Sequence, residues 1–170
     1  MNEFLLLVRP EMLLYLVAFL AYIFSVRTIT PFSFVIVGVM FLEVLHQGLT
    51  LFLNSSMKTE DHVTQVLVFH AWYIGFALTD FIFVSLIYLL SRWLNVNLGL
   101  TCQLIAAAFL ILGCLQIVGY VDGLFFDGTD WVAFIYTNSI PVINYLIFII
   151  LMGHVVVTAL RSSVRYWRTS

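Results

Sequence analysis

The stretch FLEVLHQ, residues 41–47, places three polar side chains inside a long apolar run from residue 32 to residue 53. Glu43, His46 and Gln47 have the spacing i, i+3 and i+4, so on a helix they share one face. The run is long enough to cross a bilayer, which needs about 20 apolar residues. Ionisable side chains in the middle of a span are costly and usually serve a function or a specific contact. The stretch therefore predicts a transmembrane helix with a candidate site inside it.

The composition of the whole chain agrees with a membrane protein. Of the 170 residues, 63% are hydrophobic and only 9% are charged, and the mean hydropathy is +1.09. Soluble domains carry about 25% charged residues, so this chain has too few charged side chains to cover a water-facing surface. The net charge of −2 argues against nucleic-acid binding, which needs clustered Lys and Arg.

Five apolar runs predict one all-α transmembrane domain over residues 1–170. The predicted spans are approximately 11–28, 32–53, 64–91, 99–121 and 139–160. Helices are expected because lipid offers the backbone no hydrogen-bond partners, and a β-barrel would show shorter alternating segments instead. An arrangement with four spans, in which the first run lies in the membrane interface, stays open because polar residues crowd the start of that run.

The basic residues predict the orientation of the spans. With five spans, one side receives Arg27, Arg92, Arg161, Arg165 and Arg168, and the other receives Arg9 and Lys58. The positive-inside rule then puts the C-terminus in the cytoplasm and the N-terminus outside. The predicted outer loops, residues 54–64 and 122–138, are acidic. We expect a plasma membrane or a bacterial inner membrane.

Three arginines follow the last span. Arg161, Arg165 and Arg168 have the spacing i, i+4 and i+7, so they share a face if the helix continues. The simplest interpretation is a positive-inside anchor. A more specific interpretation is a surface that binds anionic lipid or a partner protein. Each basic residue near an anionic membrane surface contributes about 1 kcal/mol of binding free energy.

Counting about 1.5 Å of rise per residue from the inner end of each span converts position into depth. Glu43 then lies ~16 Å and Asp80 ~15 Å from the inner surface, near the midplane on consecutive antiparallel helices. No Lys or Arg falls at that depth, and two neighbouring acids hinder each other's ionisation. We predict that at least one of the two carboxyl groups is protonated at neutral pH.

Other polar side chains fall nearer the two surfaces. His46 and Gln47 lie at ~21–23 Å and His154 at ~6–9 Å from the inner surface. We therefore expect His46 and Gln47 to form an outer proton relay and His154 an inner one, so that a column of polar groups runs through the bundle.

Three amides are expected to join helices. Gln103, Gln116 and Asn144 lie within apolar runs, and interhelical hydrogen bonds of this kind contribute about 0.6 kcal/mol on average. Gln116 shares a face with Gly113 and Gly119, small residues that let a second helix approach closely.

Motifs for cofactors and catalysis are missing from the sequence. The chain has no Cys-x-x-Cys pair, phosphate-binding loop or His-Glu-x-x-His motif. We therefore expect no cofactor, no metal site and no catalytic residues. Two alternatives stay open: His46 and His70 as haem ligands, or Glu43, His46 and Asp80 as metal ligands.

The leading hypothesis is a proton or cation channel or transporter that uses Glu43 and Asp80 as a midplane pair and assembles as a homo-oligomer. The second is a non-catalytic membrane subunit or sensor that holds partner proteins through its helices and basic tail. A membrane redox protein with a bound cofactor is the third.

Overall fold

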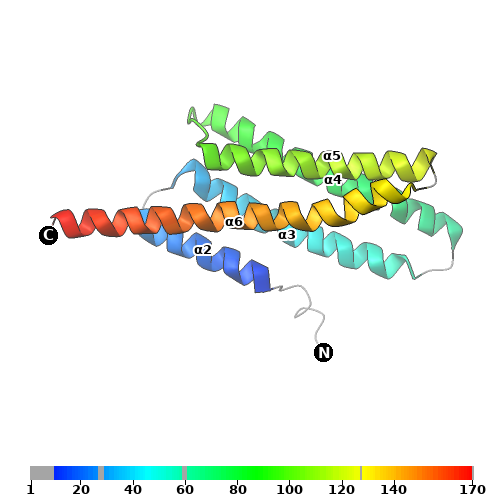
Figure 1. Cartoon of the computed structure of the whole chain (residues 1–170), viewed down its shortest axis with the longest axis horizontal. Helices are drawn as coiled ribbons and strands as arrows, with labels where there is room; N and C mark the ends of the chain where they lie inside the picture. Colours follow the sequence, from blue (N-terminus) through cyan, green and yellow to red (C-terminus); the bar gives the residue numbers. More distant parts are fainter. Residues whose placement is uncertain (1–9, 27–28, 59–60, 127, 170) are drawn as a thin grey trace.

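In a computed structural model of the protein, residues 10–26, 29–58, 61–126 and 128–169 are described, and residues 10–12 and 163–169 only by their backbone. Five helices follow one another along the chain and no strand occurs in these ranges (Figure 1). They are α2 (Pro10–Val26), α3 (Pro31–Ser56), α4 (His62–Trp93), α5 (Leu100–Phe125) and α6 (Asp130–Thr169). The prediction of an all-α bundle with five helices is confirmed.

Four of the helices, α3 to α6, are long and apolar enough to cross a membrane. The apolar part of α2, Leu13–Val26, is shorter, and α2 runs beside only part of the bundle (Figure 1). The first predicted span is therefore a helix, as expected, but one that falls short of the other four. The orientation of the termini stays a prediction, and Arg9 and Arg27 lie outside the described residues.

The helices form a ring in the order of the sequence. Each packs against its neighbours in the chain, and α2 closes the ring against α6. α2, α4 and α6 run in one direction, and α3 and α5 in the other (Figure 1). This alternation is the one that consecutive spans with short connections must adopt.

Side-chain caps begin two of the helices. Thr30 accepts a hydrogen bond from the Ser33 backbone N–H, Ser33 accepts one from the Thr30 backbone, and Pro31 takes the first position of α3. At α4, Asp61 accepts hydrogen bonds from both the backbone N–H and the hydroxyl of Thr64. These donors have no partner inside the helix, so the caps fix where α3 and α4 start.

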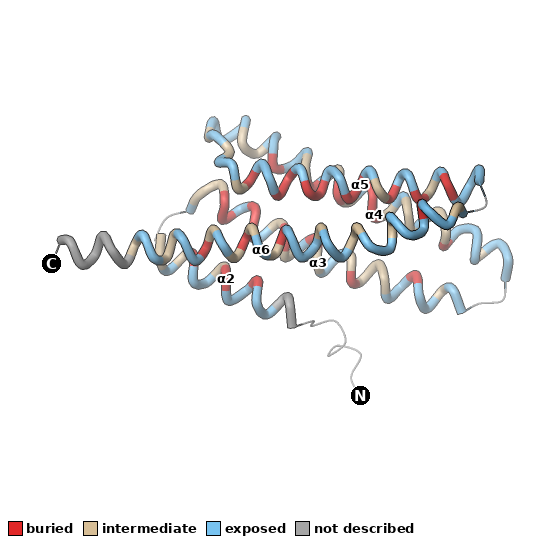
Figure 2. Tube along the Cα trace, in the orientation of Figure 1, coloured by how far each residue is buried: buried red, intermediate tan, exposed pale blue. Residues whose placement is uncertain are grey.

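The apolar side chains divide between the interior and the outer faces of the bundle. Val39, Phe109 and Leu151, from α3, α5 and α6, are fully buried, and buried segments face inward in Figure 2. Large apolar residues such as Phe41 and Leu89 remain 68% and 62% exposed. Apolar surface on this scale is compatible with a lipid environment and not with water.

Glycines bring α4 and α5 close together. A Cβ atom added to Gly113 would lie 2.7 Å from the Phe81 ring, and one added to Gly119 would lie 2.8 Å from Tyr73. The rings of α4 therefore occupy the space that side chains on α5 would need. This is the close approach expected from the small residues beside Gln116.

α6 begins nine residues earlier than the predicted span at residue 139. The predicted outer loop 122–138 was therefore wrong in extent, because most of it belongs to α5 and α6. The polar side chains of Thr137 and Asn138 bond to the carbonyls of Ala133 and Phe134 one turn earlier. Polar residues that satisfy themselves on their own helix do not interrupt it.

Candidate functional site

A hydrogen bond joins α3 and α4 near the middle of both helices. His46 Nε2 lies 2.7 Å from Thr79 Oγ1. The Thr79 hydroxyl donates to the Phe76 carbonyl at 2.8 Å and to the Gly75 carbonyl at 3.1 Å. Because the hydroxyl hydrogen points to these carbonyls, Thr79 Oγ1 accepts from His46. A neutral His46 therefore carries its proton on Nε2.

Asp80 follows Thr79 and is the most deeply buried charged residue of the described chain, with 1% of its surface exposed. Its Oδ1 atom has no hydrogen-bond partner among the described residues. That atom lies 3.6 Å from His46 Nε2, so the two form an ion pair only when His46 is protonated. A buried polar atom without a partner loses about 1–3 kcal/mol of solvation.

Glu43 and Gln47 complete the polar stretch of α3. Glu43 is half-buried and lies one turn before His46, on the same face of α3. Gln47 is buried. The structure thus places an acid, a histidine and a second acid at one interface between two apolar helices. The hydroxyl of Thr79 is a member of this group that the sequence did not reveal, because threonine is common in spans and usually bonds only to its own helix.

Polar residues toward the start of α4 and the end of α5 have partners of their own. His70 Nδ1 lies 2.9 Å from the Tyr120 hydroxyl, and Tyr136 donates to Gln116 Oε1 at 2.7 Å. These bonds join α4 to α5 and α5 to α6. Gln116 makes the interhelical contact expected of it, with a tyrosine that the sequence placed in a loop.

Asp122 connects the end of α5 to the start of α6. Both of its oxygens accept from Thr129, one from the backbone N–H at 2.8 Å and the other from the hydroxyl at 2.7 Å. The residue is buried. The sequence had placed Asp122 in an acidic loop facing water, but its carboxyl group closes a short connection between two helices.

His154 lies near the opposite end of the bundle. Its Nδ1 atom is 3.0 Å from the Thr101 hydroxyl, and its ring packs 4.1 Å from that of Phe32. Phe32 precedes His46 by 14 residues of α3, about 21 Å along the helix. Between Ser33 and Glu43, about 15 Å of this helix, the buried side chains of α3 are all apolar: Val35, Ile36, Val39 and Leu42. The expected polar column is interrupted here within the described chain.

The remaining predicted contacts lie at the surface. Gln103 is exposed and donates to the Leu98 carbonyl at 3.0 Å, which belongs to the connection before its own helix. Asn144 is exposed on α6, and so is Arg161. Neither amide therefore joins two helices as Gln116 does. The α6 backbone continues as a helix past the positions of Arg165 and Arg168, whose side chains lie outside the described residues.

Comparison with known proteins assigns no relative. No family model matches the chain, and neither the curated proteins nor the solved structures contain a match. Among the described residues, no group of three His, Cys, Asp or Glu is placed to hold a metal ion. The α3–α4 interface, with His46, Thr79 and Asp80, is the candidate functional site.

Proposed function

We propose that the protein moves protons or monovalent cations across its membrane, with Asp80 as the central titrating group. One observation carries this proposal: Asp80 is almost fully buried in the middle of an apolar helix and its Oδ1 atom lacks a hydrogen bond in the described chain. A carboxyl group kept in this state lowers stability, so its retention points to a role in function.

His46 is the group that exchanges a proton with Asp80. Nε2 and Oδ1 are 3.6 Å apart, slightly longer than a hydrogen bond, so a small rotation of either side chain closes the gap. The doubly protonated imidazole then passes its Nε2 proton to the Asp80 carboxylate and keeps the proton on Nδ1. Thr79 holds the imidazole in place through its hydroxyl. Glu43 is a second carboxyl group, one turn from His46, and we expect the two carboxyl groups to hold at least one proton between them at neutral pH.

The route requires more than one copy of the chain. The side chains of α3 between Ser33 and Glu43 are apolar, so this helix offers no polar path over about 15 Å toward His154. Glu43 is only half-buried and can therefore face a neighbouring copy. We propose a homo-oligomer in which Glu43 residues line the space between copies, and His154 acts where that space reaches the end of the bundle.

Flux measurements in liposomes test the proposal. Purified protein is reconstituted with a pH-sensitive dye inside the vesicles, and a potassium diffusion potential drives proton entry. Asp80→Asn and Glu43→Gln are expected to reduce the flux to the level of protein-free vesicles. Asp130→Asn is the matched control, because Asp130 is an exposed carboxyl at the first residue of α6. Wild-type flux in Asp80→Asn, or equal loss in the control, overturns the assignment.

A second function is favoured by the length of α6. This helix continues past the ends of its neighbours (Figure 1), and its last part carries the basic residues of the tail. We infer from this, as the alternative, a non-catalytic subunit or sensor that binds a partner through the tail and through Glu43. Purification in mild detergent separates the two functions. A stoichiometric partner that is lost in Glu43→Gln, from a protein without flux, supports the subunit.

A further inference from the structure

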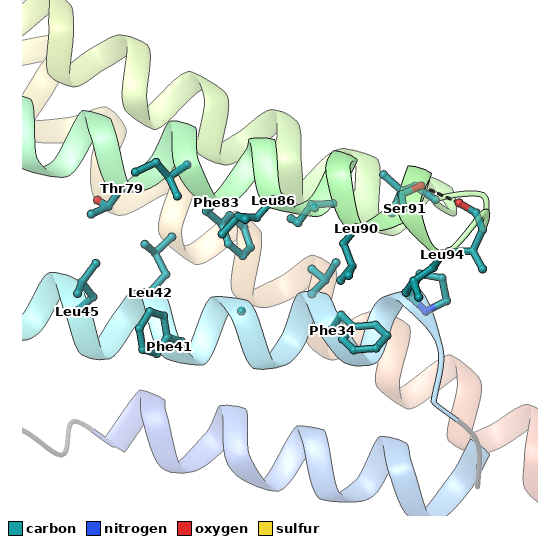
Figure 3. A pocket seen from close by; sticks show the side chains of 17 residues that line it. Phe34, Phe41, Leu42, Leu45, Thr79, Phe83, Leu86, Leu90, Ser91 and Leu94 are labelled. Atoms are coloured by element: carbon teal, nitrogen blue, oxygen red, sulfur yellow. Dashed lines mark hydrogen bonds between the residues drawn. The ribbon is translucent and has the colours of Figure 1, made fainter.

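A narrow apolar groove lies between α3 and α4, on the outer surface of the chain. Its volume is about 250 Å³. Phe34 and Phe41 line it from α3, and Leu86 and Leu90 line it from α4 (Figure 3). It extends from the connection after α4 as far as Thr79.

The groove offers nothing to a polar ligand. Its hydroxyl groups belong to Thr79 and Ser91, and both donate to backbone carbonyls, Thr79 to Phe76 and Ser91 to Val96 at 2.6 Å. No charged side chain lines it. An occupant of the groove is therefore held by van der Waals packing of its hydrocarbon against these side chains.

The length of the groove matches one leaflet of a bilayer. Thr79 and Leu94 mark its two ends on α4, 15 residues apart, which is about 22 Å of helix. Half of a bilayer, from the midplane to the outside of the headgroup region, is about 20–22 Å thick. The groove thus runs from the membrane surface to the midplane.

A basic residue stands at the surface end. Arg92 follows the lining residue Ser91 in the last turn of α4, and it is exposed, as is its neighbour Trp93. Tryptophan favours the membrane interface, and an arginine at that level attracts anionic headgroups. The opposite end, at Thr79, is midway along α4 and has no basic residue nearby on that helix.

A helix from a second protein molecule fits this groove less well than a hydrocarbon chain of a lipid does. Helices approach one another in membranes across small residues. The glycine of the lining, Gly38, is already covered, because a Cβ atom at that position would lie 2.7 Å from the Phe83 ring.

We propose that this groove binds one acyl chain of an anionic glycerophospholipid, with the headgroup at Arg92 and the end of the chain beside Thr79. The lipid then packs directly against the residue that holds His46. The proposal is independent of proton movement, because it rests on the groove and on Arg92 alone.

Photolabelling tests it. The intact protein is reconstituted in phosphatidylcholine vesicles containing a phosphatidylglycerol with a diazirine at the end of one chain, and labelled residues are located by mass spectrometry. Label is expected on the α3 and α4 residues of the groove. Leu86→Trp fills the groove and is expected to reduce this label to the level of other lipid-facing surfaces. Leu89→Trp is the matched control, because Leu89 is 62% exposed on the same helix, against 57% for Leu86, but does not line the groove.

The headgroup is tested with Arg92→Gln. Two probes are compared, a phosphatidylglycerol and a phosphatidylcholine that carry the same diazirine chain. Loss of one basic residue is expected to lower the ratio of phosphatidylglycerol to phosphatidylcholine labelling by roughly fivefold, the equivalent of about 1 kcal/mol. Equal preference before and after the change overturns the assignment of the headgroup. Equal labelling of wild type and Leu86→Trp, or a disulfide between two copies carrying Leu86→Cys, overturns the assignment of a lipid.

Discussion

α4 contacts α5 on one side and α3 on the other, and its polar residues differ between the two sides. Toward α5, His70 bonds to Tyr120, and the neighbouring Gln116 bonds to Tyr136. Toward α3, the Asp80 Oδ1 atom has no hydrogen bond among the described residues. Polar groups satisfied within one chain stabilise its fold, whereas an unsatisfied buried carboxyl indicates a function.

The packing of side chains also differs between the α4–α5 contact and the α3–α4 contact. Between α4 and α5, aromatic rings fill the space beside Gly113 and Gly119. Between α3 and α4, an apolar groove remains open at the surface. The α4–α5 pair is thus the more closely packed of the two, and the α3–α4 pair carries both features on which the proposals rest, the buried Asp80 carboxyl and the apolar groove.

The largest loss of stability is expected from a substitution at the close contact between α4 and α5. In Gly119→Ala the new Cβ atom would lie 2.8 Å from Tyr73 and 3.0 Å from Tyr136. We expect the free energy of unfolding in mixed micelles to fall by about 1–3 kcal/mol, the usual effect of overpacking. Gly153→Ala on α6 is the control, because nothing lies within 4 Å of its added Cβ. An equal loss in both variants contradicts the close packing of α4 and α5.

Replacing a polar residue by leucine should change the stability in opposite directions on the two sides of α4. Gln116→Leu removes the acceptor of the Tyr136 hydroxyl, and we expect stability to fall by about 1 kcal/mol while proton flux persists. Asp80→Leu removes an unsatisfied buried carboxyl, and we expect stability to rise by about 1 kcal/mol while flux is lost. Unfolding and flux are measured on the same preparations. A loss of stability in Asp80→Leu would show that the carboxyl group has a structural partner.

The smallest effect concerns an exposed carboxyl group that caps a helix, Asp61 at the start of α4. The hydroxyl of Thr64, followed by its backbone N–H, lowers the pKa of Asp61 below its ordinary value. Its stabilising contribution is present above the unfolded-state pKa and is lost as the pH falls through the lower, folded-state pKa. In Thr64→Val, which keeps only the backbone donor, we expect the pKa to rise part of the way back. Carboxyl NMR titration in micelles measures it, and an unchanged pKa contradicts the role of the hydroxyl.

Most of the helices could be predicted from the sequence because apolar length alone specifies a span. The start of α6 could not, because Thr137 and Asn138 count as loop-forming residues until their bonds to the preceding turn are seen. That error also hid the partner of Gln116, since Tyr136 fell in the supposed loop.

Depth counting brought Glu43 and Asp80 to one level but carried no information on helix rotation. The rotation of the helices brings His46 to Thr79. It also turns Val35, Ile36, Val39 and Leu42 of α3, all apolar, into the interior between Ser33 and Glu43. The expected relays therefore differ: His46 lies beside Asp80, whereas His154 is about 21 Å farther along the bundle.

The 40 residues of α6 give a rod of about 60 Å, twice the thickness of a bilayer's hydrocarbon core. Its C-terminal end runs beyond the other helices (Figure 1). Salt screens charges beyond about 8 Å in physiological solution, and the backbone position of Arg168 is seven residues, or about 10 Å, past Arg161. The backbone positions of the first and last tail arginines are thus farther apart along α6 than the distance over which charges interact in physiological solution.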